Sequence, residues 1–332
     1  MKYRIFAFVL LSILALNLGG STFADSKSRK GGGELVGLLP ASEGVVTLDV
    51  KRFFNDALPK LLSSNQLMLA DVTGEIDKFQ SKTGIDVRQF ESIAAGVTTK
   101  KVGEKKYDVE PVVIARGQTS AASLIGAAKL AANAKYTEER VGERTIYIFS
   151  GAKLAGSNAT DKFPGVVAVT VVDSTTIAFG TPERVRQTVE ARTKVDQELI
   201  GLLGQNPSSV TSFATRVPAG MRSFVPMDND ELGKNIDSIQ YLYGNADVSG
   251  DLTSLRVIAR TLQNTQAKSL HETLEGLQML GKAFLGSAKG ADKQVYGRMI
   301  GNAKFAVRGN EVIFYLQVPQ SDIDIIVGSL RK

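Results

Sequence analysis

The second half of this chain repeats the pattern of its first half, and this internal repeat constrains the fold more than any other feature. Residues 112–116, VVIAR, return as residues 257–260, VIAR, and a segment with helical spacing of apolar residues follows each copy. Residues 172–179 return as residues 307–314, each copy preceding a proline-led helix. Such a unit is longer than a solenoid repeat of about 20 to 50 residues. The sequence therefore predicts two related small domains.

The periodicity of apolar residues predicts the elements of each unit. In the first unit we expect strands at 45–50, 92–99, 109–116, 136–140, 145–149, 166–172 and 176–179, and helices around Pro59 and at 75–83, 120–134 and 182–193. In the second unit we expect strands at 210–216, 236–243, 252–261, 305–307 and 312–318, and helices at 266–284 and 321–330.

Strands that pair with their neighbours and helices that cover one face predict an α+β fold. We expect two related units of antiparallel sheet covered by helices, at residues 38–204 and 208–332, joined by a linker rich in turn-forming residues at 206–209. The order of elements is also compatible with a ferredoxin-like connectivity. The pattern leaves open whether the two units share one sheet.

The N-terminus has the three parts of a secretory signal peptide. Lys2 and Arg4 precede an apolar run at residues 5–18, and Ala24 ends a small-x-small cleavage site. The run is shorter than the about 20 residues that span a bilayer, although an uncleaved N-terminal anchor remains an alternative. We therefore predict a signal peptide at 1–24, a flexible leader at 25–37, a periplasmic or secreted location, and no transmembrane segment after signal removal.

Composition excludes several kinds of chemistry. The chain has no cysteine and one histidine, so thiolate catalysis, iron–sulfur clusters, cysteine zinc sites and a metal site of two imidazoles are all excluded. A net charge of +6 without clustered Lys and Arg argues against a nucleic-acid partner. No G-x-G-x-x-G or P-loop pattern occurs, so the sequence predicts no nucleotide cofactor.

Candidate catalytic motifs each have a simpler interpretation. His271 lacks a triad context and is best explained as a solvated helix residue. Residues 150–153 fit S-x-x-K and residues 82–84 fit K-T-G, but their order is the reverse of that in serine β-lactamases. The acidic run at 227–233 lacks the ligands of a calcium loop and is better explained by Asp228 as a helix N-cap.

Two further groups of charged residues are candidates for function. Carboxylates such as Asp71, Glu75 and Asp77, or Glu138 and Glu139, would act as glycosidase acids if they converged in a cleft, which the sequence does not show. The repeated Arg116 and Arg260 each stand where a strand gives way to a helix. They are candidate anion contacts, although a plain salt bridge is the simpler interpretation.

Three segments carry a family resemblance: residues 39–41 (LPA), 45–52 (VVTLDVKR) and 83–90 (TGIDVRQF). Together they resemble a group of uncharacterised secreted bacterial proteins with a duplicated α+β unit. The resemblance implies export, a bacterial source and that fold. It carries over no catalytic residue.

These observations favour an exported, non-enzymatic binding or interaction protein of the bacterial cell envelope. We expect its partner to be an envelope protein or a small ligand held at the surface or cleft between the two units, because paired domains commonly create concave sites. We predict no catalytic residue, metal or cofactor. The alternatives are a carboxylate-based hydrolase and a structural or chaperone-like envelope component.

Overall fold

The computed structural model describes residues 32–83, 85–101, 107–132, 135–150, 166–217, 230–286 and 290–329. The predicted signal peptide lies outside these residues. The strands are β1 Gly44–Asp49, β2 Phe90–Lys101, β3 Tyr107–Gly117, β4 Tyr136–Val141, β5 Arg144–Ser150, β6 Val166–Asp173, β7 Thr176–Gly180, β8 Thr211–Arg216, β9 Ile239–Ser249, β10 Leu252–Thr261, β11 Lys304–Arg308 and β12 Glu311–Pro319.

The helices are α2 Gly32–Val36, α3 Val50–Arg52, α4 Leu58–Leu61, α5 Gln66–Thr83, α6 Ala121–Ala131, α7 Pro182–Glu190, α8 Gln197–Leu203, α9 Asp230–Asp237, α10 Asn264–Gly286, α11 Ala291–Asn302 and α12 Gln320–Ser329. A π-helical turn at Phe53–Ala57 joins α3 to α4, and Pro59 lies in the first turn of α4. This is a position that proline tolerates, because the first turn needs no intrahelical donor there.

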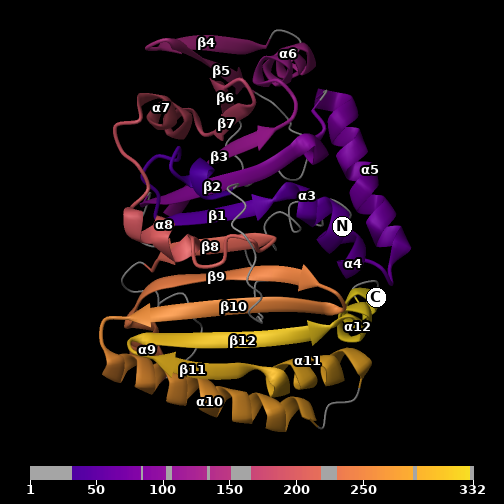
Figure 1. Ribbon diagram of the computed structural model, residues 1–332, viewed down its shortest axis with the longest axis vertical. Coiled ribbons are helices and arrows are strands. Elements are labelled where there is room, and N and C mark those ends of the chain that lie inside the picture. Colours follow the sequence, from indigo (N-terminus) through magenta and orange to yellow (C-terminus); the bar gives the residue numbers. More distant parts are fainter. Residues whose placement is uncertain are drawn as a thin grey trace.

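The described strands form a single twelve-stranded sheet that runs the length of the molecule (Figure 1). Its order is β11-β12-β10-β9-β8-β1-β2-β3-β7-β6-β5-β4. The fold is thus α+β, and the strands predicted for the two units share one sheet in which β1 lies beside β8. All neighbouring pairs among these strands are antiparallel.

The register of the sheet is symmetric about the contact of β1 with β8. Val46 pairs with Phe213 at this contact. From there, one row of paired residues extends in both directions: Phe179–Val113–Ala95–Val46–Phe213–Gly244–Val257–Phe314. Residues matched by the sequence repeat, such as Val113 and Val257, lie equally far from the centre of this row. This is the register expected of a local two-fold axis between β1 and β8.

Different helices cover the two faces of the sheet. In β3, Ile114 belongs to the main core cluster with residues of α2, α7 and α8, whereas its neighbour Ala115 packs with α6. In β10, Ile258 belongs to the same main cluster and Ala259 packs with α10. Because successive strand residues point to opposite faces, we name these the α7 face and the α10 face.

Several helix boundaries differ from the sequence prediction. Leu35 and Val36 of α2 have no exposed surface. The last part of the segment predicted as a flexible leader, residues 25–37, therefore belongs to the core. Helix α5 begins at Gln66 and not at residue 75, since the side chain of Asn65 accepts a hydrogen bond from the Met68 N–H. Helices α8 and α11 were not predicted.

Candidate functional site

The two arginines predicted as anion contacts face carboxylates. Arg116 Nε donates to Thr176 Oγ1 at 3.1 Å, and its Nη1 donates to Glu34 at 3.2 Å. Arg260 Nε donates to Glu311 at 2.9 Å, and its Nη1 donates to Glu198 at 2.8 Å. Strands β2, β1, β8 and β9 separate β3 from β10, so the two guanidinium groups do not form a common site.

Four of the candidate glycosidase carboxylates form ion pairs with cations: Glu75, Asp77, Glu138 and Glu139. Glu75 contacts Lys78 at 2.7 Å, and Glu138 contacts Lys129 at 3.0 Å. Asp77 contacts Arg88 at 3.0 Å. Glu138 and Glu139 are neighbours in β4 and point to opposite faces of the sheet.

Glu139 does not fit the general-acid role that the hydrolase hypothesis requires. Its two carboxylate oxygens accept hydrogen bonds from Arg186 Nε and Nη2, at 2.8 and 2.9 Å. This bidentate partner lowers the pKa of Glu139 below its usual range. A general acid needs the opposite shift.

The other candidate motifs supply no assembled site. His271 Nδ1 lies 3.5 Å from Glu275, its neighbour one turn along α10. Residues 151–153 of the S-x-x-K pattern, residue 84 of K-T-G and Asp228 lie outside the described residues. Across the described part of the chain, no three His, Cys, Asp or Glu residues come together to hold a metal ion.

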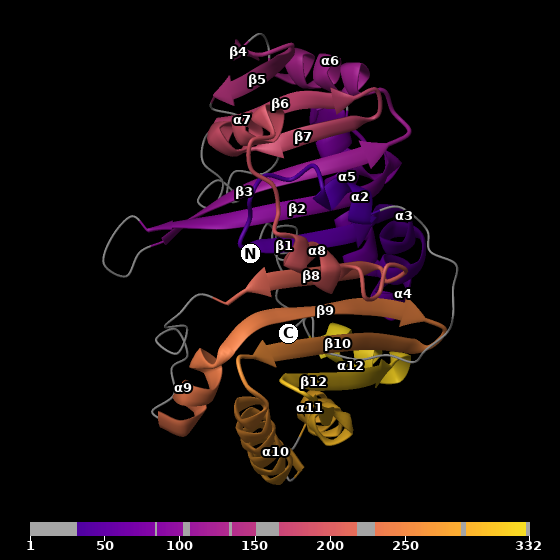
Figure 2. The same cartoon turned by 60° about the vertical axis from the view of Figure 1, so that its left-hand side comes forward.

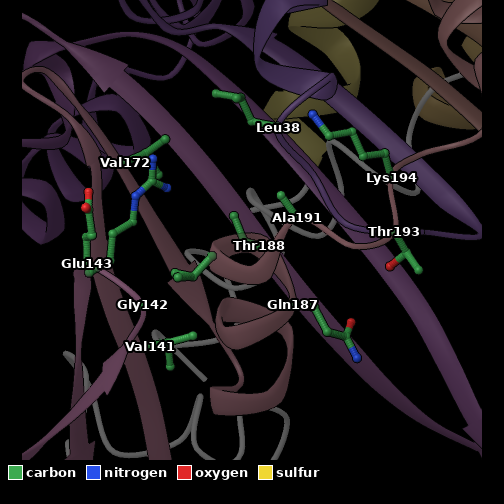
Figure 3. A pocket seen from close by; sticks show the side chains of 12 residues that line it. Leu38, Val141, Gly142, Glu143, Val172, Gln187, Thr188, Ala191, Thr193 and Lys194 are labelled. Carbon is green, nitrogen blue, oxygen red and sulfur yellow. The ribbon is translucent and has the colours of Figure 1, made fainter.

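A cavity of about 340 Å³ lies where the end of α7 faces the turn between β4 and β5 (Figure 3). Its walls come from α7 with the segment that follows it, from the β4–β5 turn, and from single residues of β6 and the segment after α2. The lining residues are Leu38, Val141, Gly142, Glu143, Arg144, Val172, Gln187, Thr188, Val189, Ala191, Thr193 and Lys194.

Two residues with positive φ shape the opposite walls. Ala191 has a φ of 52° and ends α7, with its N–H donating to Gln187 O. Gly142 has a φ of 59° in the tight turn between β4 and β5. A left-handed residue after a helix and a glycine in a hairpin turn both reverse the chain within a few residues. The two reversals leave the space between them open.

The cavity has an apolar floor. Leu38, Val141, Val172 and Val189 are partly buried and pack against the main core cluster. Thr188 donates its hydroxyl to Arg184 O at 3.0 Å, which satisfies it within α7. An apolar group entering the cavity thus meets side chains that are already held in place by the core.

The rim of the cavity carries cations that have no partner among the described residues. No hydrogen bond or ion pair joins Arg144 or Lys194 to the residues that the structure describes, and the same holds for Glu143. Figure 3 places Lys194 and Glu143 on opposite sides of the cavity. With two cations against one carboxylate, the rim favours an anionic ligand group.

Sequence reasoning missed this cavity. The hairpin around Gly142 and the helix at 182–193 were both predicted, but their approach depends on the order of the strands. The cavity lies beside β4, β5 and β6, far from the contact of β1 with β8 where the two predicted units meet.

Comparisons with known proteins identify no family. No protein-family model matches the chain, and no curated protein matches its sequence. Crystal form I of TP0453 is 9% identical with a TM-score of 0.43 over 92% of this chain and 98% of that chain. Crystal form III is 9% identical with a TM-score of 0.43 over 92% of this chain and 100% of that chain. Crystal form IV is 10% identical with a TM-score of 0.45 over 90% of this chain and 96% of that chain. A likeness this weak carries no argument about fold or function here.

The helices bear on the predicted absence of a membrane segment. Within the described ranges, none is both long enough and apolar enough to cross a bilayer.

Proposed function

We propose that this chain is an exported, non-enzymatic binding protein of the bacterial cell envelope, and that the cavity beside α7 holds a small amphiphilic anion. The observation that carries the proposal is the pair of uncommitted cations, Arg144 and Lys194, above an apolar floor. The cavity volume of about 340 Å³ lies in the range of small-molecule sites, about 300 to 1,000 Å³.

The chemistry of the lining suits a carboxylate with a short hydrocarbon chain. The planar guanidinium of Arg144 offers two parallel donors to a carboxylate, and Lys194 adds a second positive charge. The hydrocarbon part would lie on Leu38, Val172 and Val189, where each buried CH₂ contributes about 0.8 kcal/mol.

Octanoate titrated into the mature protein, followed by calorimetry, tests this site. We expect saturable binding of octanoate and at least about tenfold weaker binding of 1-octanol, which lacks the charge. Arg144→Gln should weaken octanoate binding at least about tenfold. Arg192→Gln is the matched control, because Arg192 follows the same helix, is 80% exposed and does not line the cavity.

Two results would overturn the assignment. One is the absence of saturable octanoate binding, and the other is equal loss of affinity in Arg144→Gln and in Arg192→Gln.

We also propose that residues 1–24 direct export and that residues 38–204 and 208–332 are two units related by duplication. Support for export comes from the signal-like pattern of the sequence, and support for duplication comes from the symmetric register about Val46 and Phe213. N-terminal sequencing of protein isolated from a bacterial host tests export. Mature protein that begins at Asp25 in the periplasmic or secreted fraction is expected, and full-length protein in the cytosol would contradict it.

A further inference from the structure

The edge of the sheet formed by β10, β12 and β11 presents a row of cationic and aromatic side chains. Tyr315 of β12 pairs with Arg256 of β10 on one side and with Lys304 of β11 on the other. Arg256 lies two residues from Ile258, so this row points to the α7 face. The Lys304 ammonium lies 5.9 Å from the centre of the Tyr315 ring.

Two further rows continue the same surface along the strands. The next row on this face contains Ile258, Ile313 and Ala306, and the one after it contains Arg260, Glu311 and Arg308. Lys304, Ala306 and Arg308 of the edge strand are all exposed. Because Ile258 is buried in the main core cluster, the apolar centre of the surface is formed by Ile313 and Ala306, with cations along both margins.

No described helix covers the outer two strands of this end of the α7 face, β12 and β11. Helix α10 packs on the opposite face through Ala267 and Leu270, and Val327 of α12 packs on that opposite face as well. On the α7 face, helix α8 contacts β8 and β9, and its Glu198 reaches Arg260 of β10, one strand away from β12. Figure 1 shows β10 and β12 face on with no labelled helix in front of them, and Figure 2 shows α10 and α11 lying below β12.

Three cations on this surface are not neutralised by any carboxylate in the described ranges. Among the residues that the structure describes, Arg256, Lys304 and Arg308 have no ion pair with a carboxylate. The carboxylate of Glu311 is already held by Arg260 at 2.9 Å and by the Tyr243 hydroxyl at 2.7 Å. Three uncommitted positive charges therefore face solvent on one open sheet surface.

We propose that this basic face, comprising Arg256, Lys304, Arg308 and Tyr315, binds an acidic polysaccharide chain. Lys304 and Arg308 are four residues apart in one strand, so their Cα atoms lie roughly 13 Å apart at about 3.3 Å per residue. Cations at such intervals on a flat surface suit an extended chain with a negative charge on each repeat. The half-buried Tyr315 ring offers an apolar face against which a sugar ring can lie.

This inference goes beyond the cavity beside α7, which lies near the opposite edge of the sheet. We choose a glycan as the polyanion because of the proposed export: an exported chain meets acidic glycans, whereas nucleic acid is found mainly inside the cell. The charge complementarity itself does not depend on the cavity or its ligand.

Calorimetry of the mature chain with alginate, a polymer of uronic acids, tests the proposal. We expect binding at about 50 mM NaCl that weakens steeply by about 300 mM, because counterions compete for the same charges. The double variant R256Q/K304Q should bind at least about tenfold more weakly. The control K268Q/K293Q removes the same charge from exposed positions on α10 and α11 and should change the affinity less than about twofold.

Further measurements distinguish a glycan from other polyanions and include a variant that is expected to fold. Arg308→Gln alters one exposed edge residue and should weaken alginate binding about threefold even if the double variant does not fold. Equal affinity for oligothymidylate or polyglutamate would overturn the glycan assignment. Equal losses of alginate affinity in R256Q/K304Q and K268Q/K293Q would overturn the assignment of the binding site to the basic face. Arg144→Gln should leave alginate binding unchanged, so failure at the cavity and failure here are distinguishable.

Discussion

Arg184 shows how a single buried cation joins distant segments. It is 2% exposed in α7, and its guanidinium donates to Ala41 O at 2.8 Å and to Ser42 Oγ at 2.7 Å. Its Nε is buried without a partner among the described residues, and burial lowers the pKa of the guanidinium. The side chain therefore fixes the segment before β1 against α7 by hydrogen bonds and not by an ion pair.

Replacement of Arg184 should be costly, because it removes the hydrogen bonds to Ala41 O and Ser42 Oγ and leaves a cavity at a position that is 2% exposed. We expect Arg184→Ala to lower the free energy of unfolding by about 2 to 4 kcal/mol in urea titrations. Arg184→Met, which keeps most of the volume and removes the unpartnered Nε, should lose less. Equal losses for the two variants would mean that packing alone accounts for the role of Arg184.

The ion pair of Glu139 with Arg186 makes the stability of the folded protein depend on pH, and the direction of this dependence follows from the pKa shift. The Arg186 hydrogen bonds lower the pKa of Glu139 in the folded protein below its unfolded value of about 4.3. Its contribution to stability is therefore present above about pH 4.3 and is lost as the pH falls through the folded-state pKa. Melting temperatures of the parent and of Glu139→Gln should differ at pH 7 and converge towards pH 3. A gap that stays constant over this range would contradict the assignment.

Among the elements, β9 depends on a glycine at the closest approach of two strands. A Cβ at Gly244 would collide with the carbonyl oxygen of Arg256 in β10. Gly244→Ala should therefore destabilise the protein by about 2 kcal/mol or more, since the backbone of one strand must shift. Gly126→Ala in α6 meets open space and should stabilise by up to about 1 kcal/mol, so chemical denaturation of the two variants should move in opposite directions.

Helix α10 carries an apolar stripe along its second half. Leu277, Leu280 and Phe284 recur at helical spacing, and Phe284 is 78% exposed. Because these side chains already contact water, L280Q/F284Q should change the free energy of unfolding by less than about 0.5 kcal/mol. A large loss of stability that depends on protein concentration would show instead that the stripe is covered in solution.

The success of sequence reasoning differs from element to element. The strands around Ile114 and Ile258 were predictable because each is long and β-branched, and the cap at Thr181 was predictable from Thr-Pro. Helix α8 was missed because only seven residues carry its pattern. Neither the cavity at Arg144 nor the basic face at Arg256 was predictable, because each depends on which strands are neighbours in the sheet.

At the scale of the whole molecule, α8 ties the two halves of the sheet together. Leu199 and Leu202 belong to one core cluster that also contains Val45 of β1 and Ile258 of β10. On the surface of the same helix, Glu198 accepts a hydrogen bond from Arg260 at 2.8 Å. The apolar core is therefore continuous across the contact of β1 with β8, and the two halves do not have separate cores on this face.

A continuous core of this kind predicts that both halves unfold together. Leu199→Ala removes a side chain that is 1% exposed and should cost about 2 to 4 kcal/mol. If the sheet unfolds as one unit, hydrogen exchange should accelerate by the same factor in the slowest amides of β3 and of β10, because both exchange only through global opening. Acceleration confined to β8, β9 and β10 would show that the second half opens alone, with the contact of Val46 and Phe213 as the boundary between two cooperative units.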